Sequence, residues 1–154
     1  MKTFSSIIAS PIGALGIKVQ DNTLVGLSFL LNEKVSSSSD AFIKNVEEEL
    51  ARYFENSTYR FKIPLAYQGT PFQEKVWRAL QAIPSGETLS YGALAEKLKT
   101  SARAIGNACR TNPIALIIPC HRIVSKDRLG GFCGNIQGDF LKVKSWLLRH
   151  EKVM

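Results

Sequence analysis

The residues best suited to chemistry are a cysteine and a histidine side by side, in Pro119-Cys120-His121-Arg122. A free thiol has a pKa near ~8.5, so only a small fraction of it is thiolate at neutral pH. A nearby imidazole or cation raises that fraction, and the thiolate is the form that attacks carbon. The tetrapeptide follows the apolar run 114–118, so a cysteine that only packs is a second interpretation. The surrounding elements have to decide between the two.

The excess positive charge of the chain lies entirely in its second half. The 154 residues carry a formal net charge of +7. Residues 1–69 hold seven Lys/Arg and seven Asp/Glu, whereas residues 70–154 hold thirteen and six. This asymmetry favours a polyanion as the partner of the second half, with a merely solubilising surface as the alternative.

The cysteines do not form a metal or disulfide pattern. Cys109, Cys120 and Cys133 contain no C-x-x-C pair, and His121 and His150 are far apart, so we expect no metal site. An odd number of cysteines favours reduced thiols and a cytoplasmic protein. No apolar run reaches the ~18 residues of a membrane span, and the start does not read as a signal peptide. We therefore expect no membrane partner.

The first half predicts a small sheet and one helix. Residues 1–31 alternate as strands around a hairpin turn at Asp21-Asn22. Asp40 is a suitable cap for a helix, with Glu47-Glu49 mostly on its solvent side. We expect one more strand over Arg60–Leu65. The predicted buried stripe of the helix is Phe42, Val46, Leu50 and Tyr53.

The second half predicts helices with clear starting signals. Thr70-Pro71-Phe72-Gln73 is a capping box with proline at the first helical position. Pro84-Ser85-Gly86 ends this helix, whose predicted buried stripe is Phe72, Val76, Leu80 and Ile83. Ser90 can cap a short helix over 91–98, and Thr100 or Ser101 can cap another over 102–110. This pair is typical of a helix-turn-helix.

The second of these helices has small side chains flanked by arginines. Ala102, Ala104, Gly106 and Ala108 leave little bulk beside Arg103 and Arg110, which favours close approach to a nucleic-acid backbone. Tight packing inside the protein is the alternative. Beyond Asn112-Pro113 and Cys120, the glycine-rich stretch 129–134 lacks a phosphate-loop pattern. A final helix follows Gly138-Asp139, with Phe140, Val143 and Leu147 on one face. The fold class is α+β: a small N-terminal α/β domain with an antiparallel sheet (1–66), and a mainly helical C-terminal domain with the helix-turn-helix (70–154).

With these elements placed, residues 70–154 resemble the O6-alkylguanine-DNA alkyltransferase family. The specific combination is Ile118-Pro119-Cys120-His121-Arg122-Ile123-Val124 with Asn112-Pro113 before it and Leu147-Leu148-x-x-Glu151 after it. Further matching stretches are Pro84-x-Gly86-x-x-x-Ser90-Tyr91-Gly92, Ala102-Arg103-Ala104-Ile105-Gly106 and Leu129-x-Gly131-Phe132-x-Gly134. The first half resembles the family's variable N-terminal domain only through Ser10-Pro11-x-Gly13 and its strands.

The resemblance implies a DNA repair protein that acts once. Members flip O6-alkylguanine out of duplex DNA, and O4-alkylthymine as well, and transfer the alkyl group irreversibly to their own cysteine without a cofactor. By matching motif, Cys120 is the acceptor, His121 is a base acting through a water, and Glu151 orients His121. Asn112 braces the loop that carries the cysteine. Tyr91 helps rotate the nucleotide and donates a proton to the leaving base. The expected form is a monomer on double-stranded DNA.

The resemblance also implies a DNA-binding set and a base pocket. Arg103 enters the base stack and fills the vacated space. The other DNA-binding residues are Tyr91, Gly92, Gln73, Ala102, Arg110 and Lys126. The pocket is lined by Ile123, Phe132, Cys133 and Lys144.

The chain departs from the family pattern at several places. The turn 97–101 is short and lacks the usual glycine and proline, Phe132 stands where tyrosine is common, and extra residues precede Lys144. Cys133 places a second thiol near the pocket, which suggests an oxidative link to Cys120. The alternatives are a non-catalytic sensor of alkylated DNA, a helix-turn-helix regulator and a Cys-His hydrolase. Ala102 to Ala108 offers few long polar side chains for base reading, which disfavours the regulator.

Overall fold

The computed structural model describes residues 4–31, 33–125 and 139–153. The chain forms two compact units. One comprises Met1–Tyr67 and Pro113–Ala115, and the other comprises Gln68–Asn112 and Leu116–Met154. Residues 113–115 pair with Leu27, in a strand of the first unit. None of the helices in the described ranges is long and apolar enough to span a membrane.

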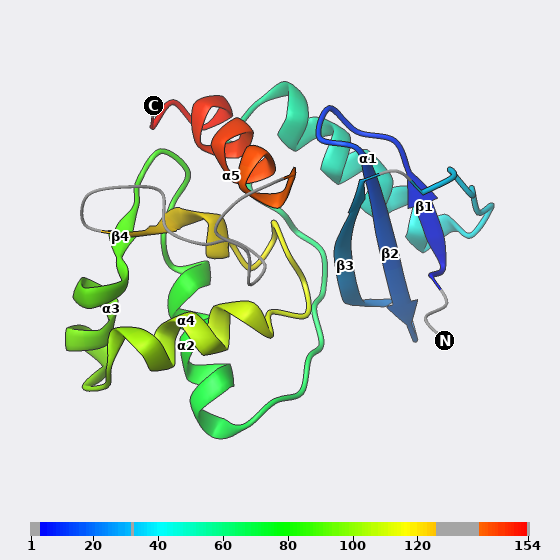
Figure 1. Ribbon diagram of the computed structural model, residues 1–154. Helices are drawn as coiled ribbons and strands as arrows, with labels where there is room; N and C mark the ends of the chain where they lie inside the picture. The colour runs from blue at the N-terminus through cyan, green and yellow to red at the C-terminus, as the bar shows by residue number, and fades with distance from the viewer. Residues whose placement is uncertain (1–3, 32, 126–138, 154) are drawn as a thin grey trace. The chain divides into compact units, whose positions relative to one another are not determined.

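The first unit is an antiparallel sheet with one helix (Figure 1). Strands β1 (Ser6–Ile8), β2 (Ala14–Gln20) and β3 (Thr23–Leu31) lie in the order β1-β2-β3. Asp21 and Asn22 have φ of 53° and 55° and join β2 to β3, which is the two-residue turn whose twist matches that of the strands. Helix α1 (Ala41–Glu55) begins at Asp40, whose carboxylate accepts from Ile43 N. Ser6 Oγ donates to Glu47 Oε2 over 2.7 Å, which ties β1 to α1.

Three predictions for this unit are wrong. Arg60–Leu65 is not a strand, because only Leu65 pairs, in a single parallel bridge to Leu24. Glu49 is buried rather than solvent-facing, and its Oε1 accepts from Lys62 N over 2.7 Å. A side chain thus satisfies a backbone donor that a sheet would otherwise satisfy. The buried stripe of α1 contains Ile43 in place of Phe42.

The second unit contains four α-helices among its described residues (Figure 1). They are α2 (Pro71–Gln81), α3 (Tyr91–Leu98), α4 (Ala102–Arg110) and α5 (Asp139–His150). The capping box at Thr70 is present, and Ser90 and Ser101 cap α3 and α4, as predicted. Two short strands, β4 (Leu89–Ser90) and β5 (Ile123–Val124), pair in parallel. This pairing places the start of α3 beside the segment that follows Cys120.

The turn between α3 and α4 contains a strained residue. Lys99 has φ 58° and ψ 51°, in the left-handed region, while Thr100 N donates to Ala95 O over 2.8 Å and Lys99 N to Glu96 O over 3.2 Å. This is a Schellman-type helix end, where glycine is the preferred residue because a side chain clashes there. The glycine that the sequence lacks in this turn is therefore replaced by a strained lysine.

We expect Lys99→Gly to stabilise the protein. Relief of the left-handed conformation gives about 1–2 kcal/mol, and the greater flexibility of glycine in the unfolded chain removes about 0.5–1 kcal/mol. The free energy of unfolding should therefore rise by roughly 0.5–1 kcal/mol, measured by urea denaturation. Lys97→Gly, inside α3, is the matched control and should lower it by about 1 kcal/mol. Equal losses in both variants would contradict the strain at Lys99.

Candidate active site

Cys120 lies in a one-turn 3₁₀ helix, η1 (Cys120–Arg122), that leads into β5. Two hydrogen bonds to the carbonyl of Ile118 hold the loop that precedes Cys120. Asn112 Nδ2 donates to Ile118 O over 2.7 Å, and Cys120 N donates to the same carbonyl over 2.8 Å. Leu116 has φ 74°, an uncommon conformation for a branched residue. The loop therefore has a fixed, partly strained shape, and Cys120 is only 5% exposed.

His121 faces a buried carboxylate. Its Nε2 lies 2.9 Å from Glu151 Oε2, just beyond α5, and both side chains are 0% exposed. An ionised carboxylate only accepts hydrogen bonds, so the proton of the neutral ring resides on Nε2. The other nitrogen, Nδ1, is buried and has no hydrogen-bond partner among the described residues. It carries the lone pair of a base.

The electrostatics keep this pair as a carboxylate and a neutral imidazole. Burial lowers the pKa of His121, and the hydrogen bond and charge of Glu151 raise it less. Arg122 and Lys144 lower it further. The pKa of Glu151 lies well below its usual range: burial raises it, but the hydrogen bonds from His121 and Arg122 outweigh burial. At neutral pH, His121 is available to accept a proton.

Arg122 binds the same carboxylate with a two-pronged contact. Its Nε donates to Glu151 Oε1 over 2.8 Å and its Nη2 to Oε2 over 2.9 Å. Its Nη1 donates to Ile83 O, in the turn after α2, over 2.6 Å. Oε2 of Glu151 therefore accepts from both Arg122 and His121.

Cys120 is protonated at rest. Burial raises the pKa of its thiol, and hydrogen bonding with the Asn112 side chain and the charge of Lys144 lower it less. Lys144 itself is 0% exposed, and its Nζ donates to Ile123 O over 2.6 Å. A buried cation is thus held beside the turn that carries the thiol.

Tyr91 connects this buried cluster to the surface. Its ring lies 5.9 Å from Lys144 Nζ, within the range of a cation–π contact. Burial, with smaller contributions from Cys109 and Cys120, raises the pKa of Tyr91 to about 12. The phenol therefore stays protonated and can donate a hydrogen bond. Cys109, on α4, is a further free cysteine in this region, and burial raises its pKa strongly.

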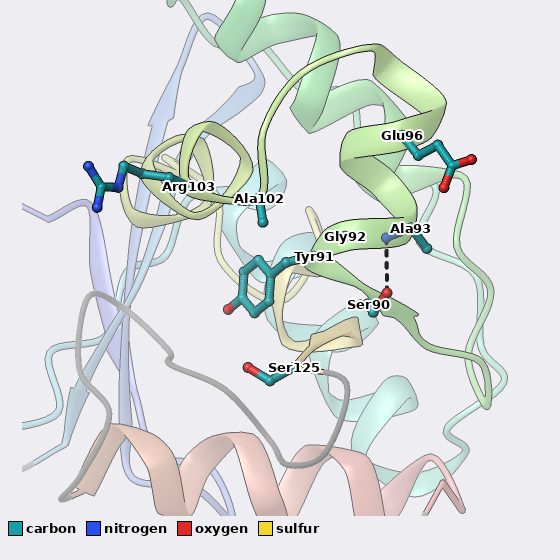
Figure 2. Close-up of a pocket in the computed structure, with 8 residues that line it drawn as sticks. All are labelled: Ser90, Tyr91, Gly92, Ala93, Glu96, Ala102, Arg103 and Ser125. Carbon is teal, nitrogen blue, oxygen red and sulfur yellow. Dashed lines mark hydrogen bonds between the residues drawn. The ribbon is translucent and has the colours of Figure 1, made fainter.

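An open pocket of about 660 Å³ lies at the start of α3 and α4. Figure 2 shows the Tyr91 side chain extending from the start of α3, with Arg103 and Glu96 on opposite sides. A Cβ atom added at Gly92 would have no neighbouring atom within 4 Å among the described residues, so the surface there is open. The lining residues are Ser90, Tyr91, Gly92, Ala93, Glu96, Ala102, Arg103 and Ser125. The pocket thus combines small residues, helix starts, one cation (Arg103) and one carboxylate (Glu96).

The outer face of α4 carries basic side chains between small ones. Arg103, Asn107 and Arg110 recur at four and three residues and are exposed, as is Ala102. Only Ile105 and Ala108 of this helix are buried. Gln73 differs from the other predicted DNA contacts, because its Oε1 accepts from Thr70 N and its Nε2 donates to Thr111 Oγ1. Its amide is engaged inside the protein.

Several predicted residues lie outside the described ranges, and others had no predicted role. Lys126, Phe132 and Cys133 fall within 126–138, so the pocket lining and the link from Cys133 to Cys120 stay predictions. The structure adds Arg122, Ser125 and Cys109 to the site region. Arg122 belongs to the Pro-Cys-His-Arg motif, but its partner Glu151 is 29 residues away, so no local sequence pattern predicts the contact.

Comparisons with known proteins agree on one family. A family model described as "6-O-methylguanine DNA methyltransferase, DNA binding domain" matches residues 71–153. A methylated-DNA–protein-cysteine methyltransferase of Methanosarcina acetivorans is 35% identical over 156 residues, covering 96% of this chain and 97% of the relative.

Solved structures similar to this chain point to the same family. Mycobacterium tuberculosis OGT in complex with DNA has a TM-score of 0.80 and 36% identity, covering 95% of this chain and 91% of that one. An O6-methylguanine DNA methyltransferase from Methanococcus jannaschii has a TM-score of 0.69 and 32% identity, covering 96% and 93%. The predicted α+β class with a helix-turn-helix is confirmed, and the chain belongs to the methylated-DNA–protein-cysteine methyltransferase family.

Proposed function

We propose that this protein repairs DNA by flipping O6-alkylguanine out of the duplex and moving the alkyl group irreversibly to Cys120. One observation carries the proposal: a thiol adjoins a neutral histidine whose Nε2 is fixed by a buried carboxylate and whose Nδ1 is a free base. The same displacement suits O4-alkylthymine. No step needs a cofactor.

The reaction is a displacement at an sp³ carbon. His121 Nδ1 takes the thiol proton through a water, and the sulfur electron pair then forms the S–C bond. The C–O6 bond breaks with its electron pair on guanine, which takes up one proton. The products are S-alkylcysteine and unmodified guanine, so each protein molecule reacts once.

The electrostatics of the site explain why a base is needed. Burial raises the pKa of Cys120, so a thiolate does not accumulate before reaction. Asn112 and Lys144 favour the thiolate as it forms. Burial raises the pKa of Tyr91 to about 12, so Tyr91 is a neutral phenol at neutral pH and supplies a hydrogen bond to the leaving base.

The DNA-binding role belongs to α4 and the start of α3. Small residues allow close approach to a minor groove, and Arg103 is placed to fill the space left by the flipped base. Arg110 contacts phosphate, as does Lys126. Gly92 and Ala102 leave room for the DNA backbone. Gln73 completes the DNA-binding set through the second hydrogen of Nε2, since the first is donated to Thr111 Oγ1. Ile123, Phe132, Cys133 and Lys144 form the base pocket.

The protein acts in the cytoplasm as a monomer on double-stranded DNA. The acceptor must be a reduced thiol, and Cys109 and Cys120 are both free in this structure. Reducing conditions preserve such thiols.

The test is to weigh the product. The protein is incubated with duplex DNA containing O6-methylguanine, digested and analysed by peptide mass spectrometry. We expect one methyl group per protein, on the peptide that contains Cys120, and unmodified guanine in the DNA. An unmodified Cys120 beside an intact lesion would overturn the proposal.

A further inference from the structure

Arg122 makes three hydrogen bonds to residues that the structure describes. Two run to the two oxygens of Glu151, and the third runs to Ile83 O. The Arg122 side chain is 12% exposed and that of Glu151 is 0% exposed. A planar guanidinium that binds both oxygens fixes the carboxylate in position and in plane.

The fixed carboxylate determines how His121 is presented. Glu151 Oε2 lies 2.9 Å from both His121 Nε2 and Arg122 Nη2. Because the carboxylate stays ionised and can only accept, the neutral ring must keep its proton on Nε2. Nδ1 is then left without a proton, on the edge of the ring away from Glu151.

We propose that Arg122 is a positioning residue for alkyl transfer, which acts through Glu151 to hold His121 in the tautomer and orientation that a general base needs. The inference rests on the proposed function, since His121 is the base of that reaction. The Ile83 contact extends the same role, because it anchors the guanidinium to the turn that ends α2.

The charge of Arg122 also favours the neutral form of His121, which is the form that can act as a base. The groups that act on His121 are Glu151, Arg122 and Lys144, and Cys120 adjoins it in the same turn. Burial is the largest cause and lowers the pKa of His121, Glu151 raises it, and Arg122 and Lys144 lower it further. Glu151 alone would favour an imidazolium, which cannot accept the thiol proton. Arg122 adds to burial in offsetting this effect, and it leaves the hydrogen bond between Glu151 and His121 intact.

Two substitutions separate charge from geometry. Arg122→Lys keeps the cation but loses the planar fork, and Arg122→Gln loses both. Arg149→Gln, an exposed position on α5, is the matched control. The single-turnover rate with free O6-benzylguanine is measured against pH for each protein, which avoids any effect on DNA binding. Folding is checked by circular dichroism.

The titration of His121 is measured separately by NMR. The chain has two histidines, so His150→Gln assigns the signals. In the unmodified protein, activity should fall only as the pH drops below the ordinary histidine range, because the pKa of His121 is lowered. This measurement does not depend on alkyl transfer.

We expect Arg122→Lys to react on the order of tenfold to a hundredfold more slowly, with a nearly unchanged acid limb. Arg122→Gln should be at least as slow, and its acid limb and the His121 titration should both move to higher pH. Unchanged rates and titrations in folded variants would overturn the proposal. Failure of both variants to fold would also overturn it, in favour of a structural role. An unmodified protein without transfer would instead contradict the proposed function.

Discussion

We expect Cys120→Ala to abolish alkyl transfer and to leave DNA binding intact. Removal of the sulfur removes the atom that forms the new bond in the proposed reaction, so the rate should fall by more than about a thousandfold. Affinity for duplex DNA should stay within about twofold, because the side chain is 5% exposed and lies off the outer face of α4. Peptide mass spectrometry and fluorescence anisotropy measure the two properties.

The matched control for this result is Cys109→Ala. Cys109 is also a free cysteine, but it lies on α4 and has no place in the proposed displacement. Alkyl transfer should persist in this variant, with the modification still on Cys120. A methylated Cys109 in the Cys120→Ala protein would contradict the assignment of the acceptor.

Arg103→Ala has the second largest expected effect, and it depends on the substrate. Unstacking a base costs a few kcal/mol, and each 1.4 kcal/mol is a factor of ten in rate. If the guanidinium holds the base out of the stack, repair in duplex DNA should slow by about 30- to 300-fold. The rate with free O6-benzylguanine should change by less than about twofold, because no base has to be flipped.

Arg110→Ala tests the alternative that Arg103 acts only by its charge. Both arginines are exposed on α4, seven residues apart. Loss of a phosphate contact should weaken DNA binding and reduce its salt dependence by about one ion, but leave the rate at saturating DNA unchanged. Equal slowing of duplex and free-base reactions by Arg103→Ala would contradict the flipping role.

Local sequence signals predicted the helices well because caps act within four residues. Thr70, Ser90 and Ser101 each accept from the backbone three residues on, as their positions suggested. The hairpin at Asp21-Asn22 was predictable for the same reason. The fold class follows from these elements in order.

The wrong predictions involve contacts between distant segments. Residues 60–64 have a strand-like pattern, but Glu49 on α1 binds Lys62 N instead of a neighbouring strand. Sequence patterns favour a charged residue on the solvent side, and they cannot show that a carboxylate has a buried backbone partner.

In the candidate site, too, some features are visible in the sequence and others depend on contacts between distant segments. The adjacency of Cys120 and His121 is visible in the sequence, whereas Glu151 lies 30 residues away and only the family resemblance suggested its role. The fork of Arg122 and the burial of Lys144 depend on how α5 packs beside η1. These contacts are products of tertiary structure.

Residues 113–115 belong to the first unit although the chain on either side of them belongs to the second, and this limits how the protein can be divided. Leu27 N donates to Pro113 O over 3.1 Å, and Ala115 N donates to Leu27 O over 3.0 Å, so β3 pairs with the stretch between Asn112 and the loop of Cys120. A gene fragment that encodes only residues 68–154 would leave these backbone groups without their partner strand. The two units are therefore not interchangeable modules: any exchange of the N-terminal half between relatives has to supply a strand that matches this stretch.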